Sequence, residues 1–253
     1  MSQPEVAITR IMVALDTSAC SSAALDTAAE LASALGAQLL GLFVEDINLL
    51  RLAGLPFARE VGRASAAARP LDFSEMERAM RLEAARAQRS IAGAAQRMQL
   101  QWSFRVTRGQ MIAQVLAEAE QVDMVVLGRT GESAAATAGP VLVLFDGRPA
   151  ARQALATAVR LAKANERPLG VLIPADTTEI FRQQRELAAA SLGSGAPRVH
   201  YIALAGGDVA HLARAVCAEK CSAFVLASGS LPAGADEVGA LIHAIGCPLV
   251  LLK

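Results

Sequence analysis

The fold is decided by residues 11–46, which read IMVALDTSACSSAALDTAAELASALGAQLLGLFVED. The stretch contains an apolar run without alternation, an aspartate, a segment with helical spacing and a second apolar run. Strands that are apolar at every position are buried on both faces, which is typical of a parallel sheet whose strands are joined by helices. The stretch therefore predicts a β-α-β unit of an α/β protein.

The same pattern returns further along the chain, at an offset of 130 residues. Residues 141–176 read VLVLFDGRPAARQALATAVRLAKANERPLGVLIPAD, and they align with 11–46 without a gap, so that Asp146 falls opposite Asp16. Both aspartates end an apolar strand. The repeat predicts two copies of one α/β unit in a single chain.

The two copies remain similar beyond these stretches. Residues 102–128 match residues 199–227 as strand, glycine, helix and strand. We expect two tandem doubly wound parallel-sheet (Rossmann-like) domains, an N-terminal one over 1–139 and a C-terminal one over 140–253.

The first copy is shorter at its end. The strand at 141–146 begins the second copy, which keeps a terminal helix and a fifth strand over 235–252; the first copy lacks both and is left with four strands. A bare sheet edge is normally covered. We therefore expect the edge beside strand 123–128 to be covered by the second copy or by a second chain in a homodimer.

The first copy also carries a long insert over residues 47–72, followed by a predicted helix over 73–98. Within the insert, residues 48–57 read NLLRLAGLPF, and we expect such an apolar segment to pack against another surface. One interpretation is packing on the chain's own helix. The others are a surface for a protein partner and a lid over a ligand site.

Composition excludes several classes of function. The 24 basic and 24 acidic residues cancel, so bulk charge favours no nucleic acid partner. No apolar run reaches the length of a membrane span and the start has no signal peptide, so we expect a cytoplasmic protein. The four cysteines lie far apart and are expected as reduced thiols, with Cys217 and Cys221 as buried small residues rather than metal ligands.

Four stretches resemble the universal stress protein family, and a tandem two-domain member in particular: IMVALDTSACSSAAL, LLGLFVED, RGQMIAQVLAEAEQVDMVVLG and IGCPLVLL. The resemblance implies a five-stranded parallel sheet in each domain. It also implies a protein without an assigned catalytic reaction, and many members of the family bind ATP. The sequence itself shows no Ser-His-Asp arrangement, paired catalytic carboxylates or Walker motif, which agrees with a protein that is not an enzyme.

The resemblance further implies an adenine nucleotide site in the first copy. An adenosine group would lie beside the end of the first strand, adenine beside the end of the second, and phosphates on a Gly-x-x-Gly loop. The residues carried over are Ala14, Asp16, Val44, Gly128, Arg129 and Gly131. A role for Asp16 as the cap of the first helix is an open alternative.

Neither copy keeps the complete family pattern. In the first, the closing glycine and hydroxyl residue are missing, and Pro140 has no N–H for a phosphate. A loss of two or three hydrogen bonds to charge, each contributing about 1.5–3 kcal/mol, turns a micromolar site into a millimolar one. In the second, Ala227 replaces the first glycine and Asp236 would repel phosphate.

The sequence thus predicts a regulatory or interaction module of the stress response, non-catalytic, in which nucleotide binding is weak or lost. One alternative is an ATP-binding switch that uses the first copy and closes the phosphate site with residues 132–139 or the insert. A more distant alternative is an enzyme of the adenine-nucleotide hydrolase superfamily. That class expects a serine- and glycine-rich loop after the first strand, and the sequence DTSACSS at 16–22 has no glycine.

Overall fold

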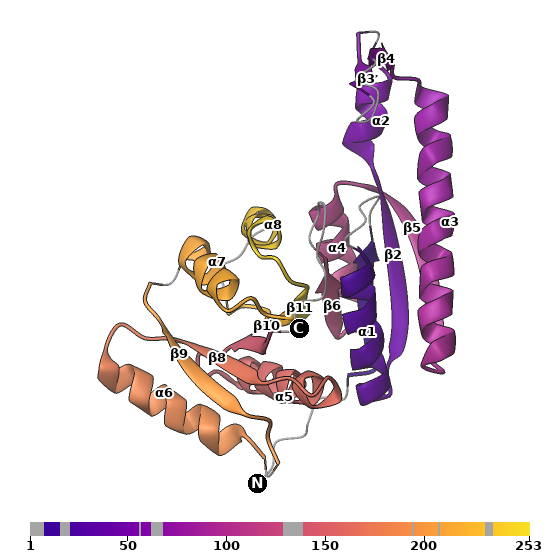
Figure 1. The fold of residues 1–253 in the computed structure, drawn as a ribbon. Coiled ribbons are helices and arrows are strands. Elements are labelled where there is room, and N and C mark those ends of the chain that lie inside the picture. The colour runs from indigo at the N-terminus through magenta and orange to yellow at the C-terminus, as the bar shows by residue number, and fades with distance from the viewer. Residues whose placement is uncertain are drawn as a thin grey trace.

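Figure 1 shows the computed structural model of the chain, which describes residues 8–15, 21–55, 57–61, 68–128, 139–193, 195–206, 208–230 and 235–253. The strands are β1 (Arg10–Leu15), β2 (Gln38–Asp46), β3 (Arg59–Val61), β4 (Ala68–Pro70), β5 (Trp102–Gly109), β6 (Met124–Leu127), β7 (Val141–Leu144), β8 (Leu169–Pro174), β9 (Val199–Leu204), β10 (Ala223–Ala227) and β11 (Leu249–Leu252). The helices are α1 (Ser21–Leu35), α2 (Ile47–Ala53), α3 (Phe73–Arg97), α4 (Met111–Ala119), α5 (Pro149–Ala164), α6 (Thr178–Ser191), α7 (Val209–Ala218) and α8 (Ala235–Ala244).

Nine of the strands form one continuous sheet in the order β5-β2-β1-β6-β11-β10-β7-β8-β9. We call β5-β2-β1-β6 and their helices the N-terminal half, and β11-β10-β7-β8-β9 and theirs the C-terminal half. All neighbouring strands within each half are parallel. Each half has the strand order of a doubly wound unit, so the predicted fold class is confirmed.

The two halves meet at an antiparallel pair, β6 with β11, in which Val126 is opposite Val250. The strands predicted at 141–146 and 248–252 are β7 and β11, and both belong to the C-terminal half. The edge of β6 is covered by β11 of the same chain. This confirms the prediction that the second copy covers the edge, and a second chain is not needed there. The sequence predicts that the first copy has no terminal helix between β6 and β7. Residues 129–138, where such a helix would lie, are outside the described residues.

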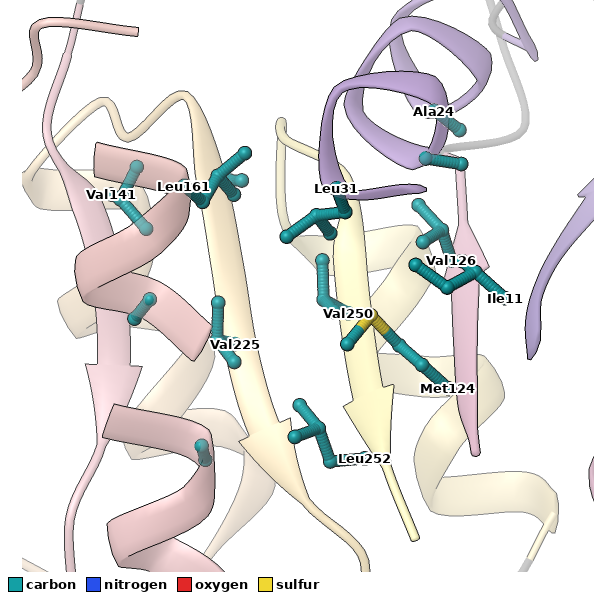
Figure 2. Packing of buried hydrophobic residues seen from close by; sticks show 14 of the residues in the cluster. Ile11, Ala24, Leu31, Met124, Val126, Val141, Leu161, Val225, Val250 and Leu252 are labelled. Atoms are coloured by element: carbon teal, nitrogen blue, oxygen red, sulfur yellow. The ribbon is translucent and has the colours of Figure 1, made fainter. Parts of the chain in front are cut away.

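Helices cover both faces of the sheet. One core cluster joins the sheet to α1, α3, α5 and α6, and the other joins it to α4, α7 and α8. Strands β6, β7 and β10 are buried at every position, as expected of parallel strands between two helix layers. Figure 2 shows Val250 of β11 between Val126 and Val225, so the first core cluster runs through the junction without a break.

Polar contacts also fasten the halves together. Asn165, after α5, donates to Glu30 of α1 at 2.7 Å. The backbone N–H of Lys253 donates to the Asp123 carbonyl oxygen at 3.2 Å. At the chain end, the Lys253 ammonium donates to the Glu120 carbonyl at 2.7 Å. The last residue of the C-terminal half is thus bound to the N-terminal half.

The insert over 47–72 has secondary structure of its own. It contains α2 and a hairpin of β3 and β4, which together with the start of α3 extend beyond the end of the sheet (Figure 1). Asp46 caps α2 by accepting from the Asn48 N–H, and Asp72 caps α3 by accepting from the Glu75 N–H. We call α2, the hairpin and the start of α3 the arm.

Candidate functional site

The candidate site lies at the carboxyl-terminal ends of β1, β2 and β6. Ala14 of β1 is the register partner of Leu127, and Gly128 directly follows Leu127. Leu15 pairs with Phe43, which places Val44 at the same edge. The chain proceeds from β1 to β2 and β5 on one side and returns to β6 on the other. Open α/β sheets bind ligands at such a reversal of strand order.

Three of the six predicted site residues are therefore neighbours in space: Ala14, Val44 and Gly128. The other three, Asp16, Arg129 and Gly131, lie outside the described residues. The side chains of Ala14 and Val44 are buried in the core cluster with Leu42 and Leu127. At these two positions the side chains pack the core, so a ligand at this edge would meet main-chain groups and the residues that follow the strands.

A network of charged side chains lies beside Val44, and it was not predicted from the sequence. Arg108, near the end of β5, donates through Nε to Glu45 Oε2 at 3.0 Å, and its Nη2 lies 3.4 Å from Glu77 Oε1 on α3. The hydrogen bond and the charge of Glu45 raise the pKa of Arg108 above its ordinary value. This guanidinium is thus paired with two carboxylates of the chain itself.

The same edge of the C-terminal half is occupied by the chain's own side chains. Asp146 follows β7 and accepts from Arg148 through the backbone N–H at 3.0 Å and through Nε at 2.7 Å. A hydrogen bond from Ser230, after β10, adds to these. Burial raises the pKa of Asp146, but the bonds and the charge of Arg148 outweigh it and hold that pKa below its ordinary value.

The loop after β10 uses its main-chain groups internally. The N–H of Ser228 donates to the Leu252 carbonyl at 2.6 Å, and the N–H of Ser230 donates to the Ala227 carbonyl at 3.1 Å. Gly229 between them has a φ of 81°, which glycine adopts readily. Asp236 lies in the first turn of α8 with Glu237. The N–H groups of Ser228 and Ser230 are therefore already bonded within the fold, and carboxylates stand at the positive end of α8.

The part of the chain that the structure describes offers few groups for other chemistry. No group of three or more His, Cys, Asp and Glu side chains there lies close enough to hold a metal ion. None of the helices described has the length and apolar character needed to cross a membrane. Cys221 is buried, as predicted. The prediction that Cys217 is buried was wrong, because this residue is exposed near the end of α7. Its thiol donates a hydrogen bond to the Ala244 carbonyl.

Comparisons with known proteins agree with this fold. The family model described as the universal stress protein family matches residues 7–139, just over half of the chain. No curated protein matches the sequence. A universal stress protein from Archaeoglobus fulgidus superimposes with a TM-score of 0.60 at 14% identity, covering 96% of each chain.

Two further solved structures match the chain over almost its whole length. A universal stress protein candidate from Pseudomonas aeruginosa has a TM-score of 0.51 and 16% identity, covering 98% of this chain and 94% of that one. The cytoplasmic domain of a prokaryotic cation chloride cotransporter has a TM-score of 0.51 and 10% identity, covering 97% of this chain and 96% of the other. At these identities the similarity is one of fold.

Proposed function

The chain belongs to the universal stress protein family, and we propose that it is a non-catalytic cytoplasmic protein of the stress response that acts by binding a protein partner through its arm. In this proposal the two halves are tandem copies joined at Gly139–Pro140. They form a rigid platform, and the arm is the element that the partner recognises.

The arm carries the observation behind this proposal. Its apolar side chains divide into two sets. Leu50 and Ala53 of α2 are buried, and α2 packs on α3. Leu52, Leu55 and Phe57 are exposed, with 76% of Phe57 accessible. The first set packs within the molecule, whereas the second set lies at the surface, where another molecule can reach it. Clustered exposed apolar side chains mark interaction surfaces in proteins that are otherwise well packed.

Charge reversal on the arm tests the proposal. The double variant Leu52→Glu, Phe57→Glu should fold, because both side chains are exposed, and should weaken binding of a partner identified by cross-linking in stressed cells by more than about tenfold. A matched control is Leu187→Glu on α6, which is 43% exposed in the C-terminal half, away from the arm (Figure 1). The proposal fails if the arm variant keeps its partner, or if both variants lose it equally.

In this proposal, nucleotide binding is weak and is not what the protein mainly does. The C-terminal half would bind none, since Asp146 is neutralised by Arg148 and the Ser228 and Ser230 N–H groups are bonded. The N-terminal half would bind an adenine nucleotide weakly, since Arg108 is held by two carboxylates.

An ATP-binding switch is the second candidate. The observation that favours it is the meeting of Ala14, Val44 and Gly128 at the reversal of strand order between β1 and β6. A switch needs ATP to bind at cellular concentrations and to change what the arm binds. Measuring partner affinity with and without saturating ATP distinguishes the two. An unchanged affinity supports the simple interaction module, whereas a change of several-fold supports the switch.

A further inference from the structure

Two buried cysteines face each other where β10 and β11 begin. Cys221 lies two residues before β10 and Cys247 two residues before β11. The strands are parallel neighbours, with Phe224 opposite Leu249. Both cysteines belong to the same core cluster and are only 3% and 4% exposed. Their Sγ atoms are 2.8 Å apart.

This geometry suits a covalent bond between the two sulfurs. The two residues precede neighbouring parallel strands, and their side chains meet between them. The 2.8 Å between the sulfurs is well inside the roughly 3.5–4.0 Å at which nonbonded heavy atoms rest, and it approaches the S–S bond length of about 2.05 Å. We propose that Cys221 and Cys247 are a disulfide-forming pair that ties β10 to β11 when the protein meets a peroxide.

The reaction balances with hydrogen peroxide as the oxidant. The sulfur of one thiol, as its proton leaves, attacks a peroxide oxygen; the O–O bond breaks and gives a sulfenic acid and one water. The second sulfur then attacks the sulfenic sulfur, the S–O bond breaks and a second water leaves. The two thiols together lose two electrons, and the peroxide is reduced to two waters.

The surroundings set the rate of this reaction. The hydrogen bond to Cys221 and burial raise the pKa of the Cys247 thiol, so little thiolate is present at neutral pH. The pair therefore reacts slowly, and faster as the pH rises. It would respond to sustained oxidation rather than to a brief pulse.

The bond would act on the junction between the halves. β11 pairs with β10 on one side and with β6 of the N-terminal half on the other. Cys221 and Cys247 are 26 residues apart in sequence, so the bond closes a loop of moderate length in the unfolded chain. Oxidation would stabilise β11, the strand that covers the edge of β6 in the N-terminal half.

The test uses the full chain, incubated with excess hydrogen peroxide at pH 8 and then digested without reduction. We expect a Cys221–Cys247 linked peptide that the untreated protein lacks, and a rise of roughly 5–10 °C in the thermal midpoint that dithiothreitol reverses. Cys217→Ser should behave like the unmodified protein, because Cys217 is exposed and outside the pair. Cys247→Ala should lose both the linked peptide and the rise.

Several outcomes would overturn the proposal. These are four free thiols after prolonged oxidation, a linked peptide that contains Cys217 or Cys20 instead, or a sulfinic acid at Cys221 in place of the bond. The peptide map of the unmodified protein decides the question even where Cys247→Ala does not fold.

Discussion

The two halves of this sheet have one plan but end differently. The C-terminal half has five parallel strands, whereas the N-terminal half has four and takes β11 as its neighbour. At the carboxyl-terminal edge, Asp146 is neutralised by Arg148, while the aligned position to Arg148 in the first copy is Ser18. The C-terminal half thus has five strands of its own and a neutralised aspartate at its edge. In the N-terminal half, β6 takes its outer neighbour from the other half, and Gly128 follows β6 directly.

This difference shows how two halves of one sheet can divide their tasks. A complete sheet half can serve as the support, because its edge strand β11 satisfies the backbone groups of β6. The supported half is then free to carry other features, and it is the half that carries the arm. Four measurements test this difference between the halves.

The largest effect is expected from separating the halves. Residues 140–253, expressed alone, should fold cooperatively, because they contain all five strands of their half, and should dimerise through the edge of β11 that β6 covers in the full chain. Residues 1–139, expressed alone, should aggregate or form dimers, because β6 then has a bare edge. Circular dichroism and light scattering check both. A stable monomer of 1–139 would contradict the dependence of the N-terminal half.

A smaller effect is expected from Gly139, at the entry to the C-terminal half. A Cβ at this residue would lie 1.9 Å from the Lys220 carbonyl oxygen, a backbone atom that cannot easily move. Gly139→Ala should lower the free energy of unfolding by about 1–3 kcal/mol in urea denaturation. Gly193→Ala is the control, since nothing lies within 4 Å of its Cβ, and should change stability by less than about 0.5 kcal/mol. Equal effects would show that close packing at Gly139 does not matter.

A still smaller effect is expected from Arg148. The folded pKa of Asp146 is below the ordinary 3.8, so its pairing stabilises the fold above that pH and is lost as the pH falls through the folded pKa. Arg148→Met should therefore cost up to about 1 kcal/mol at pH 7, because the Arg148 side chain is 55% exposed, and the cost should disappear at a pH below the folded pKa of Asp146. Urea unfolding at the two pH values checks this. A cost that is the same at both would assign the effect to packing instead of charge.

Much of the fold was predictable from the sequence, because strands apolar at every position and a repeated aspartate leave few architectures. The α2 helix and the β3–β4 hairpin were not predicted. The segment NLLRLAGLPF has no helical repeat long enough to recognise, and α2 is set by its Asp46 cap and by packing on α3. The burial of Cys217 was also predicted wrongly. The face of α7 that is exposed to solvent depends on where α8 packs, and the sequence does not give that position.

The candidate site was predictable only in part. The positions of Ala14, Val44 and Gly128 at one edge follow from the ends of apolar strands. The pairing of Arg108 with Glu45 and Glu77 does not, since it joins three elements whose contact depends on how α3 crosses the sheet. Nor does the hydrogen bond between Ser230 and Asp146, which requires the turn after β10 to fold toward β7.

Calorimetric titration with ATP tests the central difference between the halves most directly. The account predicts at most one nucleotide per chain, with a dissociation constant of about 1 mM or weaker and adenosine binding nearly as well. Gly128→Val should abolish this binding by blocking the backbone, and Asp146→Ala should leave it unchanged. Two nucleotides per chain, loss of binding in Asp146→Ala, or micromolar ATP binding with preference over adenosine would contradict it.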